Sequence, residues 1–258
     1  MAIIDETTRF DADSIENPVV GIAATVGTHD SGMHHHQKHQ LLFAASGCMS
    51  ISLDGAKCIL PPTRAAWIPA GIEHYAKMSN VVAYRSLYFD SELCVDVPDM
   101  VTVFSVNPLL RALIERMAFW EWEKPQSEQV NMMALFFEEL SAAPKENMAL
   151  PLPSDRRLQR WLDGVVGEHY QPQPLNQVAF TVGASAKTVT RIFTKETGMP
   201  YQSWRQQWRL LMAIQYLSEG KSVADTASEL DFSSDSAFVS FFRQQTGETP
   251  GKYVGEGQ

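Results

Sequence analysis

The sequence predicts an α+β protein of two domains: a small N-terminal β-barrel followed by two helices, and an all-α C-terminal domain with two helix-turn-helix units. Three observations lead to this fold class. The apolar pattern changes from short strands to helical spacing at Asn107. A segment with three prolines, residues 144–153, separates the two halves. The ending Phe-x-x-x-Thr-Gly occurs twice, beginning at Phe193 and at Phe242.

Charge is distributed unevenly along the chain. Residues 1–150 carry 10 Lys and Arg against 19 Asp and Glu, whereas residues 151–258 carry 11 of each sign. The net charge of −9 therefore belongs to the N-terminal half. A neutral C-terminal half predicts only modest non-specific affinity for nucleic acid, and an acidic half beside it is typical of a sensor joined to a DNA-binding module.

Cysteine usage and hydropathy point to the cytoplasm. Three cysteines without Cys-x-x-Cys spacing favour reduced thiols over a disulfide framework. No apolar run approaches the roughly 20 residues of a membrane span. The start, residues 1–6, is too acidic and too briefly apolar for a signal peptide. We therefore expect a cytoplasmic protein.

Short strands are predicted between residues 19 and 90. Residues 39–45 form an apolar run, and residues 49–53 alternate between apolar and polar side chains. Asp54-Gly55 follows, a strong signal for a two-residue hairpin because both turn positions need a positive φ. Strands of this length and spacing favour a small barrel or sandwich.

Two helices are predicted after the strands. Asn107-Pro108 is a helix start signal, and apolar residues then recur at helical spacing up to Ala118. A second helix is predicted after Pro125. Its apolar positions are Val130, Met133, Ala134, Phe137 and Leu140. The pair would either pack over the barrel or form a dimer interface.

The proline-rich segment defines the predicted domain boundaries. We assign residues 1–145 to a sensor and dimerisation domain, residues 146–154 to a linker and residues 155–258 to the helical domain. Ser154 is the expected N-cap of a helix that runs from Asp155 to about Tyr170. The inner face of this helix would carry Leu158, Trp161, Leu162 and Val165.

The first helix-turn-helix unit is predicted between residues 175 and 198. Gly183 lies where the turn needs a left-handed residue, and Ser185 is the expected cap of the second helix. The inward positions of this second helix are Val189, Ile192 and Phe193. Its outward positions, which would enter the major groove, are Lys187, Thr190 and Arg191. The alternative is an ordinary solvated helix face.

The second unit repeats this plan between residues 223 and 247, with Asp231 at the turn and a turn one residue longer. The inward positions are Phe238, Phe241 and Phe242. The outward positions are Ser236, Val239 and Ser240, beside Asp235. Because this face lacks arginine and Asp235 would repel phosphate, we expect it to position the protein more than to discriminate bases.

A continuous helix is predicted between the two units, over residues 201–218. Its length of about 27 Å would hold the two recognition helices near successive major grooves.

The region from residue 175 to residue 253 resembles the paired helix-turn-helix domain of the AraC/XylS family of bacterial transcription regulators. The residues that carry the resemblance are Ala179, Gly183, Ser185, Arg191, Phe193, Gly198, Arg209, Leu210, Ala213, Ala227, Phe232, Phe238, Phe242, Gly247, Thr249, Pro250 and Tyr253. The family usually has Gly at the position of Asp231 and Arg at that of Ser240. The resemblance implies a homodimer that binds promoter or operator DNA, with RNA polymerase as a further candidate partner.

Histidine is concentrated in the N-terminal half. The patterns His34-x-His36-x-x-x-Gln40 and Pro69-x-Gly71-x-x-His74 resemble the two motifs of the cupin barrel, a common sensor domain of AraC/XylS regulators. The resemblance implies a metal site of His34, His36, Gln40 and His74, with Gln40 where the pattern usually has Glu. Three imidazoles suit zinc, nickel, iron or copper.

Two other interpretations of the histidines stay open. They would line a metal-free pocket for an organic effector, whose apolar wall would include Phe43, Trp67 and Tyr84, or they would form a solvated loop. The main functional hypothesis is a transcription regulator without enzymatic activity. The alternatives are a cupin metalloenzyme, a dioxygenase or isomerase with an appended helical domain, and a helical scaffold or adaptor. The metalloenzyme leaves the duplicated helix-turn-helix unexplained.

Overall fold

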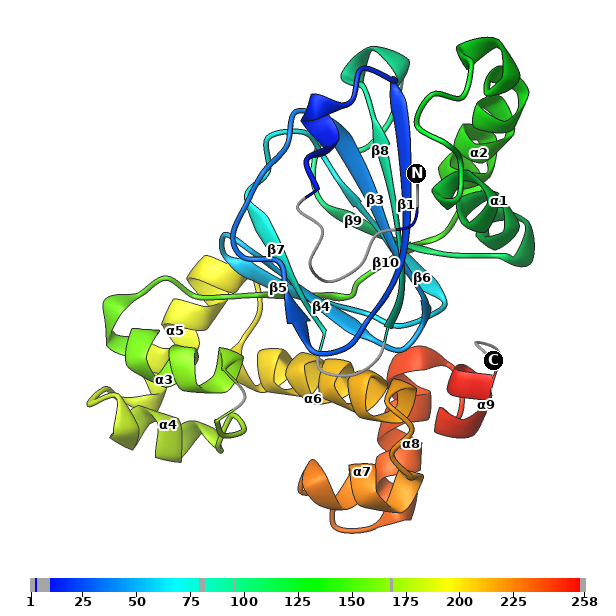
Figure 1. The fold of residues 1–258 in the computed structure, drawn as a ribbon. Coiled ribbons are helices and arrows are strands. Elements are labelled where there is room, and N and C mark those ends of the chain that lie inside the picture. The colour runs from blue at the N-terminus through cyan, green and yellow to red at the C-terminus, as the bar shows by residue number, and fades with distance from the viewer. Residues whose placement is uncertain (1–2, 4–9, 79–81, 95, 168, 256–258) are drawn as a thin grey trace. The chain divides into compact units, whose positions relative to one another are not determined.

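The computed structural model describes Ile3 and residues 10–78, 82–94, 96–167 and 169–255. The chain divides into two compact units. The first contains residues 1–52, 59–148 and 254–258, and the second contains residues 53–58 and 149–253. The first unit is rich in strands and the second is mainly helical, which confirms the predicted α+β class (Figure 1).

The strands form two sheets. Their orders are β1-β8-β3-β6-β9-β10 and β11-β5-β4-β7-β2. The strand bounds are β1 Val19–Val26, β2 His29–Asp30, β3 His39–Ser46, β4 Met49–Leu53, β5 Ala56–Leu60, β6 Arg64–Ile68, β7 His74–Met78, β8 Val82–Phe89, β9 Thr102–Ser105, β10 Lys145–Glu146 and β11 Ala149–Pro151. The predicted strands at residues 39–45 and 49–53 are confirmed, and the two residues Asp54-Gly55 join β4 to β5 as expected. Gly55 takes a positive φ of +73°, but Asp54 does not, so the expectation of a positive φ at both turn positions was wrong.

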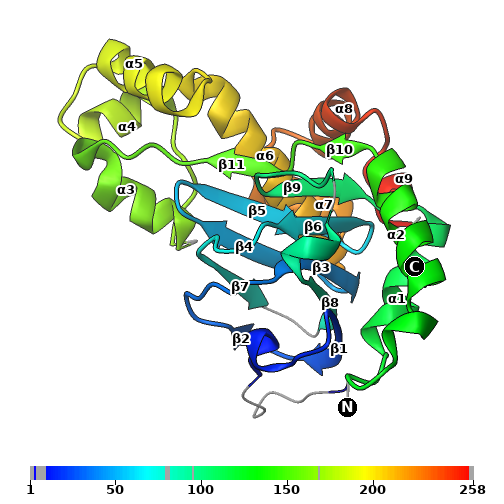
Figure 2. The same ribbon diagram turned by 90° about the horizontal axis from the view of Figure 1, so that it is seen from above.

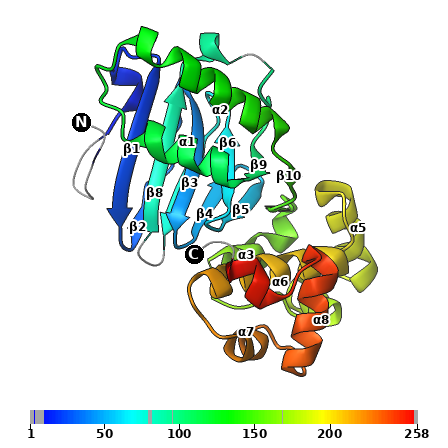
Figure 3. The same cartoon turned by 90° about the vertical axis from the view of Figure 1, so that its right-hand side faces the viewer.

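Alternation along β3 and β8 gives the larger sheet two different faces. Leu41 and Phe43 of β3 belong to an apolar core cluster, whereas Gln40 and Leu42 line a cavity on the other side. The helices α1, Pro108–Ala118, and α2, Val130–Ala142, lie along the core side (Figure 3). The face that carries Gln40 is therefore free to form a binding site.

Helix α1 approaches strand β1 closely at Gly21. A Cβ atom at this position would lie 2.2 Å from the carbonyl oxygen of Met117. At its other end, α1 begins as predicted, because the Asn107 side chain accepts a hydrogen bond from the Leu110 N–H at 2.8 Å.

The buried stripe of α2 differs from the prediction. Phe136 and Leu140 are buried, whereas Val130 is 59% exposed and Ala134 is also exposed. The stripe is centred on Phe136, and Phe137 and Met133 pack only partly against the core. Several apolar side chains of this helix pair consequently remain at the surface.

The second unit consists of seven helices among the described residues. Their bounds are α3 Arg156–Val166, α4 Leu175–Thr181, α5 Ala186–Thr197, α6 Tyr201–Ser218, α7 Val223–Glu229, α8 Asp235–Thr246 and α9 Pro250–Gly255. Helix α6 has the predicted bounds, with α3 to α5 near one end and α7 and α8 near the other (Figure 2). Three short 3-10 helices complete the described elements: Ala12–Ser14, Ser91–Leu93 and Gln126–Glu128.

The N-terminus of α3 is capped twice, and not by the predicted Ser154 side chain. The Asp155 carboxylate accepts a hydrogen bond from the Arg157 N–H at 3.0 Å. In addition, Glu196 Oε2, at the end of α5, accepts hydrogen bonds from the backbone N–H groups of Ser154 at 2.8 Å and Asp155 at 3.1 Å. Carboxylates are better caps here than the Ser154 hydroxyl, because they accept hydrogen bonds from the free N–H groups and place a negative charge at the positive end of the helix.

An aromatic cluster forms the core of the first helix-turn-helix. The rings of Trp161, Phe193, Tyr201 and Trp204 lie 5.0 to 6.2 Å apart between centroids. The predicted inner face of α3, including Trp161, is thus confirmed. All three cysteines are free thiols. Within the described residues, no helix combines the length and the apolar character that crossing a membrane requires.

Candidate functional site

The first helix-turn-helix is built as the sequence predicts. Gly183 takes the left-handed conformation, with φ +64°, and Ser185 Oγ accepts a hydrogen bond from the Thr188 N–H at 3.1 Å to start α5. Val189 and Phe193 anchor the inner face of α5 because both are fully buried. The outer face of α5 therefore has a fixed orientation relative to its own core.

The outer face of α5 carries the predicted DNA-reading residues. Lys187 and Arg191 are exposed, and Thr190 is half-buried. In the part of the chain that the structure describes, neither cation is held in an ion pair. Hydrogen bonds from Arg157 lower the pKa of Asp155 to about 2, and the positive charge of Arg191 adds a smaller contribution to this shift. Both cations are free to contact a nucleic acid.

The second unit reproduces the plan with a different turn. Asp231 takes the left-handed conformation, with φ +54°, and five residues instead of four separate α7 from α8. Ser234 Oγ caps α8 by accepting from the Ala237 N–H at 3.2 Å. Phe238 and Phe242 are fully buried, and Phe241 is half-buried.

The outer face of α8 carries no cation in its first two turns. Ser236 and Ser240 are exposed and Val239 is half-buried. Asp235, in the first turn, is also exposed. The outer faces of α5 and α8 thus present unequal surfaces, one basic and one neutral to acidic.

A cavity of about 420 Å³ lies in the first unit. Its lining includes apolar side chains such as those of Ile22, Ala24 and Leu42. The three predicted histidines also line it. The volume falls within the range of cavities that bind small organic molecules.

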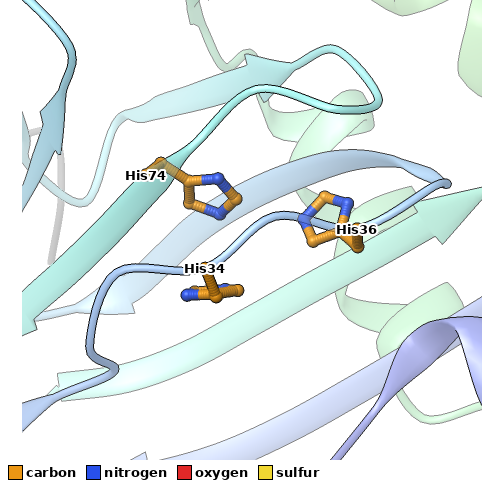
Figure 4. A group of neighbouring side chains, drawn as sticks. All are labelled: His34, His36 and His74. Carbon is orange, nitrogen blue, oxygen red and sulfur yellow. The ribbon is translucent and has the colours of Figure 1, made fainter.

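The three histidines converge although they do not share a strand. His34, His36 and His74 each offer one nitrogen, and these nitrogens all lie within 4.8 Å of one another (Figure 4). His34 and His36 precede β3, and a short antiparallel bridge joins His34 to His74 through backbone hydrogen bonds of 3.0 and 2.9 Å. The bridge places His34 beside His74.

Backbone carbonyls face one nitrogen of each ring. The Nδ1 atom of His34 lies 2.9 Å from the Gly32 oxygen, that of His36 lies 2.5 Å from the Lys38 oxygen, and that of His74 lies 2.9 Å from the Ile72 oxygen. A carbonyl oxygen only accepts hydrogen bonds, so Nδ1 carries the proton in each neutral ring. The lone pair of each ring is therefore on Nε2.

Gln40 joins two of these rings to the floor of the cavity. Its Oε1 lies 3.0 Å from Nε2 of His36 and 3.0 Å from Nε2 of His74. Its Nε2 lies 2.9 Å from both Ser86 Oγ and Tyr88 Oη. The position predicted as the fourth ligand is thus in direct contact with the histidines.

Burial favours the neutral forms of His74, Tyr84 and Tyr88. Desolvation lowers the pKa of His74 to about 4, a shift that the backbone hydrogen bond to Ile72 only partly opposes. Desolvation also raises the pKa of Tyr84, and it raises that of Tyr88 well above the ordinary range. At neutral pH the His74 ring is neutral and both tyrosines keep their hydroxyl protons.

The predicted apolar wall of the pocket was partly wrong. Tyr84 lines the cavity. Phe43 and Trp67 do not, because both are fully buried in the core cluster on the opposite face of the sheet. Alternation along β3 that starts from Gln40 excludes Phe43, and the pairing of β3 with β8 places Tyr88, which the sequence analysis missed, opposite Gln40.

Two known protein families match consecutive parts of the chain. Residues 16–177 match the AraC-like ligand binding domain, and residues 178–255 match a helix-turn-helix domain. The chain belongs to the AraC family of transcriptional regulators. Its fold class, its sensor-like first domain and its paired helix-turn-helix are those that the sequence predicts.

Similar proteins include other regulators of transcription. The AraC-family chain is 28% identical over 248 residues to the regulator NimR of Escherichia coli, covering 95% of this chain and 90% of that protein. It is 26% identical over 223 residues to ExsA of Pseudomonas aeruginosa, covering 83% and 76%. Unsaturated fatty acid bound ToxT of Vibrio cholerae aligns over 92% of this chain and 93% of its own, with 8% identity and a TM-score of 0.36.

Proposed function

We propose that this AraC-family regulator binds promoter or operator DNA through the outer faces of α5 and α8. Lys187 and Arg191 support this assignment, because they are exposed on a helix whose opposite face is fixed in a core. Arginine pairs well with guanine in the major groove. Ser236, Val239 and Ser240 would contribute positioning contacts from α8.

We further propose that the cavity of the first unit receives the regulatory signal, and that its polar end binds one divalent transition metal. Each of the three rings offers one nitrogen within 4.8 Å of the others, and the Nδ1 atom of every ring lies within hydrogen-bonding distance of a backbone carbonyl. Metal-binding histidines in proteins are usually held in this way. His34, His36 and His74 would hold the ion together with Oε1 of Gln40, and the ion would supply a Lewis acid for an effector.

The orientation of the Gln40 amide carries this proposal. With Oε1 toward the two imidazoles, lone pairs of His36, His74 and Gln40 face each other at 3.0 Å, which is repulsive unless a cation lies among them. Zinc, nickel, iron and copper all accept such a ligand set. The neutral state of His74 suits it as a ligand at physiological pH.

A metal-free cavity for an organic effector is the second candidate, and the same atoms favour it when the amide is turned by 180°. The two N–H bonds of Gln40 then donate to His36 and His74, and its oxygen accepts from Ser86 and Tyr88, so Gln40 is paired with all four partners without an ion. The cavity volume of about 420 Å³, far larger than one ion needs, also fits an organic ligand.

Elemental analysis distinguishes the two candidates. Untagged protein purified without chelators would be compared with the His34→Ala/His74→Ala variant and with Gln40→Glu, after titration with zinc, nickel and iron. His29→Ala is the matched control, because His29 lines the cavity outside the cluster. Near-stoichiometric metal in the wild type and the control, lost in the double variant, supports the metal site.

Metal in Gln40→Glu but not in the wild type would overturn the metal proposal. It would show instead that the glutamine amide replaces the ion, and the effector would then be organic. A carboxylate at this position is a stronger ligand than an amide, so this variant also shows that the cluster itself is intact.

Four large apolar side chains of α1, α2 and their connection are exposed, which supports a homodimer through this helix pair. Leu109 is 45% exposed, Phe119 49%, Val130 59% and Leu135 38%. Exposed apolar side chains on packed helices are typical of interaction surfaces. Sedimentation of the wild type and of Val130→Glu tests this proposal.

The remaining proposals extend the predictions made from the sequence. We propose a cytoplasmic regulator without enzymatic activity, with residues 1–145 as sensor and dimerisation domain, residues 146–154 as linker and residues 155–258 as DNA-binding domain. RNA polymerase is a candidate partner. Expression of residues 155–258 alone, followed by circular dichroism and DNA titration, tests the proposed boundary.

A further inference from the structure

The turn of the second helix-turn-helix has an unusual backbone. Asp231 takes a left-handed conformation, with φ +54°, which L-residues other than glycine seldom adopt. The chain passes through this conformation between the end of α7 and the start of α8, with the Asp231 N–H bonded to the Ser228 oxygen at 3.1 Å. The carbonyl groups on either side of the turn need partners from elsewhere.

Arg209, in the middle of α6, supplies these partners. Its Nη2 donates hydrogen bonds to the carbonyl oxygen of Leu230 at 2.5 Å and to that of Asp231 at 2.9 Å. Its guanidinium also lies over the Phe232 ring, 4.4 Å from the ring centroid. One side chain thus holds three consecutive residues of the turn.

Phe232 extends this contact to α8. Its ring centroid lies 5.3 Å from that of Phe238 and 5.1 Å from that of Phe241. Phe238 is fully buried and fixes the inner face of the recognition helix. A continuous set of contacts therefore runs from α6 through Arg209 and Phe232 to the helix that carries Ser236 and Ser240.

We propose that Arg209 is a positioning residue for the second recognition helix and that, in this chain, its contacts also compensate for the cost of a left-handed aspartate at the turn. The guanidinium places a positive charge at the C-terminal end of α7, where the free carbonyls and the Asp231 carboxylate are negative. It thereby sets the orientation of α8 relative to α6. Lysine would not replace it, because an ammonium group lacks the planar geometry that binds carbonyls and stacks on a ring at once.

The inference rests on the proposed DNA contacts of α8, so the test first measures those contacts. A duplex would be selected from a random-sequence library by the full-length wild-type chain. Two derivatives would then have either the half that α5 contacts or the half that α8 contacts scrambled. If scrambling the α8 half leaves wild-type affinity unchanged, the proposed contacts of α8 are wrong, and the inference falls with them.

The variants are Arg209→Ala, Asp231→Gly and the double substitution. We expect Arg209→Ala to weaken binding to the selected duplex at least fivefold, to remove most of the wild-type preference for the unscrambled α8 half, and to change the preference for the unscrambled α5 half less than twofold. Asp231→Gly should change wild-type affinity less than twofold. In the Arg209→Ala background it should restore affinity at least threefold, because glycine takes the left-handed conformation without support.

Arg205→Ala is the matched control. It removes the same charge from the same helix, but Arg205 donates to the Pro172 oxygen at 2.6 Å and does not contact the turn. Discrimination at the α8 half should survive in this variant. If circular dichroism shows that Arg209→Ala does not fold, Arg209→Lys takes its place with the same expected selective loss.

Any of three results would overturn the proposed role of Arg209. Equal losses at the two halves would show that Arg209 serves only general stability. Unchanged discrimination at the α8 half in Arg209→Ala, with normal wild-type discrimination there, would show that the turn holds its conformation unaided. Failure of Asp231→Gly to restore binding more in the variant than in the wild type would exclude compensation.

Discussion

Replacement of Arg191 tests the assignment of α5 as the recognition helix. Arg191 is exposed, and the buried face of α5 is formed by Val189, Ile192 and Phe193. Arg191→Ala should therefore leave the fold intact, with a change in stability within about 0.5 kcal/mol. A bidentate arginine–guanine contact discriminates by about 1 to 3 kcal/mol, which corresponds to a loss of roughly 5- to 150-fold in specific affinity.

Fluorescence anisotropy with the selected duplex and a scrambled duplex, at several salt concentrations, measures this loss. Affinity for the scrambled duplex should fall much less than specific affinity, because that binding depends on total charge. Arg116→Ala is the control, since it removes an exposed arginine from α1, outside the helical unit. Unchanged discrimination between the two duplexes in Arg191→Ala would refute the recognition-helix assignment.

Four further substitutions test other parts of the structure. Asp235→Asn should strengthen DNA binding several-fold, because it removes a negative charge from α8. Ser240→Ala should weaken DNA binding less than Arg191→Ala does. Titration by anisotropy compares these three variants, and a larger loss for Ser240→Ala than for Arg191→Ala would reverse the ranking of the helices. Glu196→Ala should lower the free energy of unfolding by about 1 kcal/mol, because this carboxylate caps α3, and an unchanged urea midpoint would contradict that role. Val130→Glu should shift a dimer to monomer in sedimentation, and an unaltered dimer would place the interface elsewhere.

The helical half could be predicted in detail because its signals are local. Caps, left-handed turn residues and apolar spacing lie within a few positions of each other, so Gly183, Ser185 and the bounds of α6 were predicted correctly. The cap of α3 was missed for a physical reason. Glu196 reaches the N-terminus of α3 from another helix, about forty positions along the chain, and no local pattern signals that contact.

The candidate site was predictable in composition but not in arrangement. The spacing of His34, His36 and His74 indicated a cluster, and the cluster exists. The apolar wall was not predictable from composition, because neighbouring strand positions face opposite sides and Phe43 falls on the core side. To decide which residues of β3 face the cavity, the facing of one residue must be known first. Gln40 shows it only through its contacts with His36 and His74, which the sequence does not reveal.

The difference between the two recognition helices has a consequence for how this regulator occupies DNA. Residues 151–258 carry equal numbers of positive and negative side chains, and α8 adds an acidic group where α5 has cations. Few phosphate contacts mean weak non-specific binding and a shallow dependence on salt. If the proposed contacts hold, specific affinity comes mainly from α5, and a second copy of the chain would raise occupancy by linking two such contacts. Under this arrangement, a signal that changes dimerisation through α1 and α2 regulates DNA binding without altering either recognition helix.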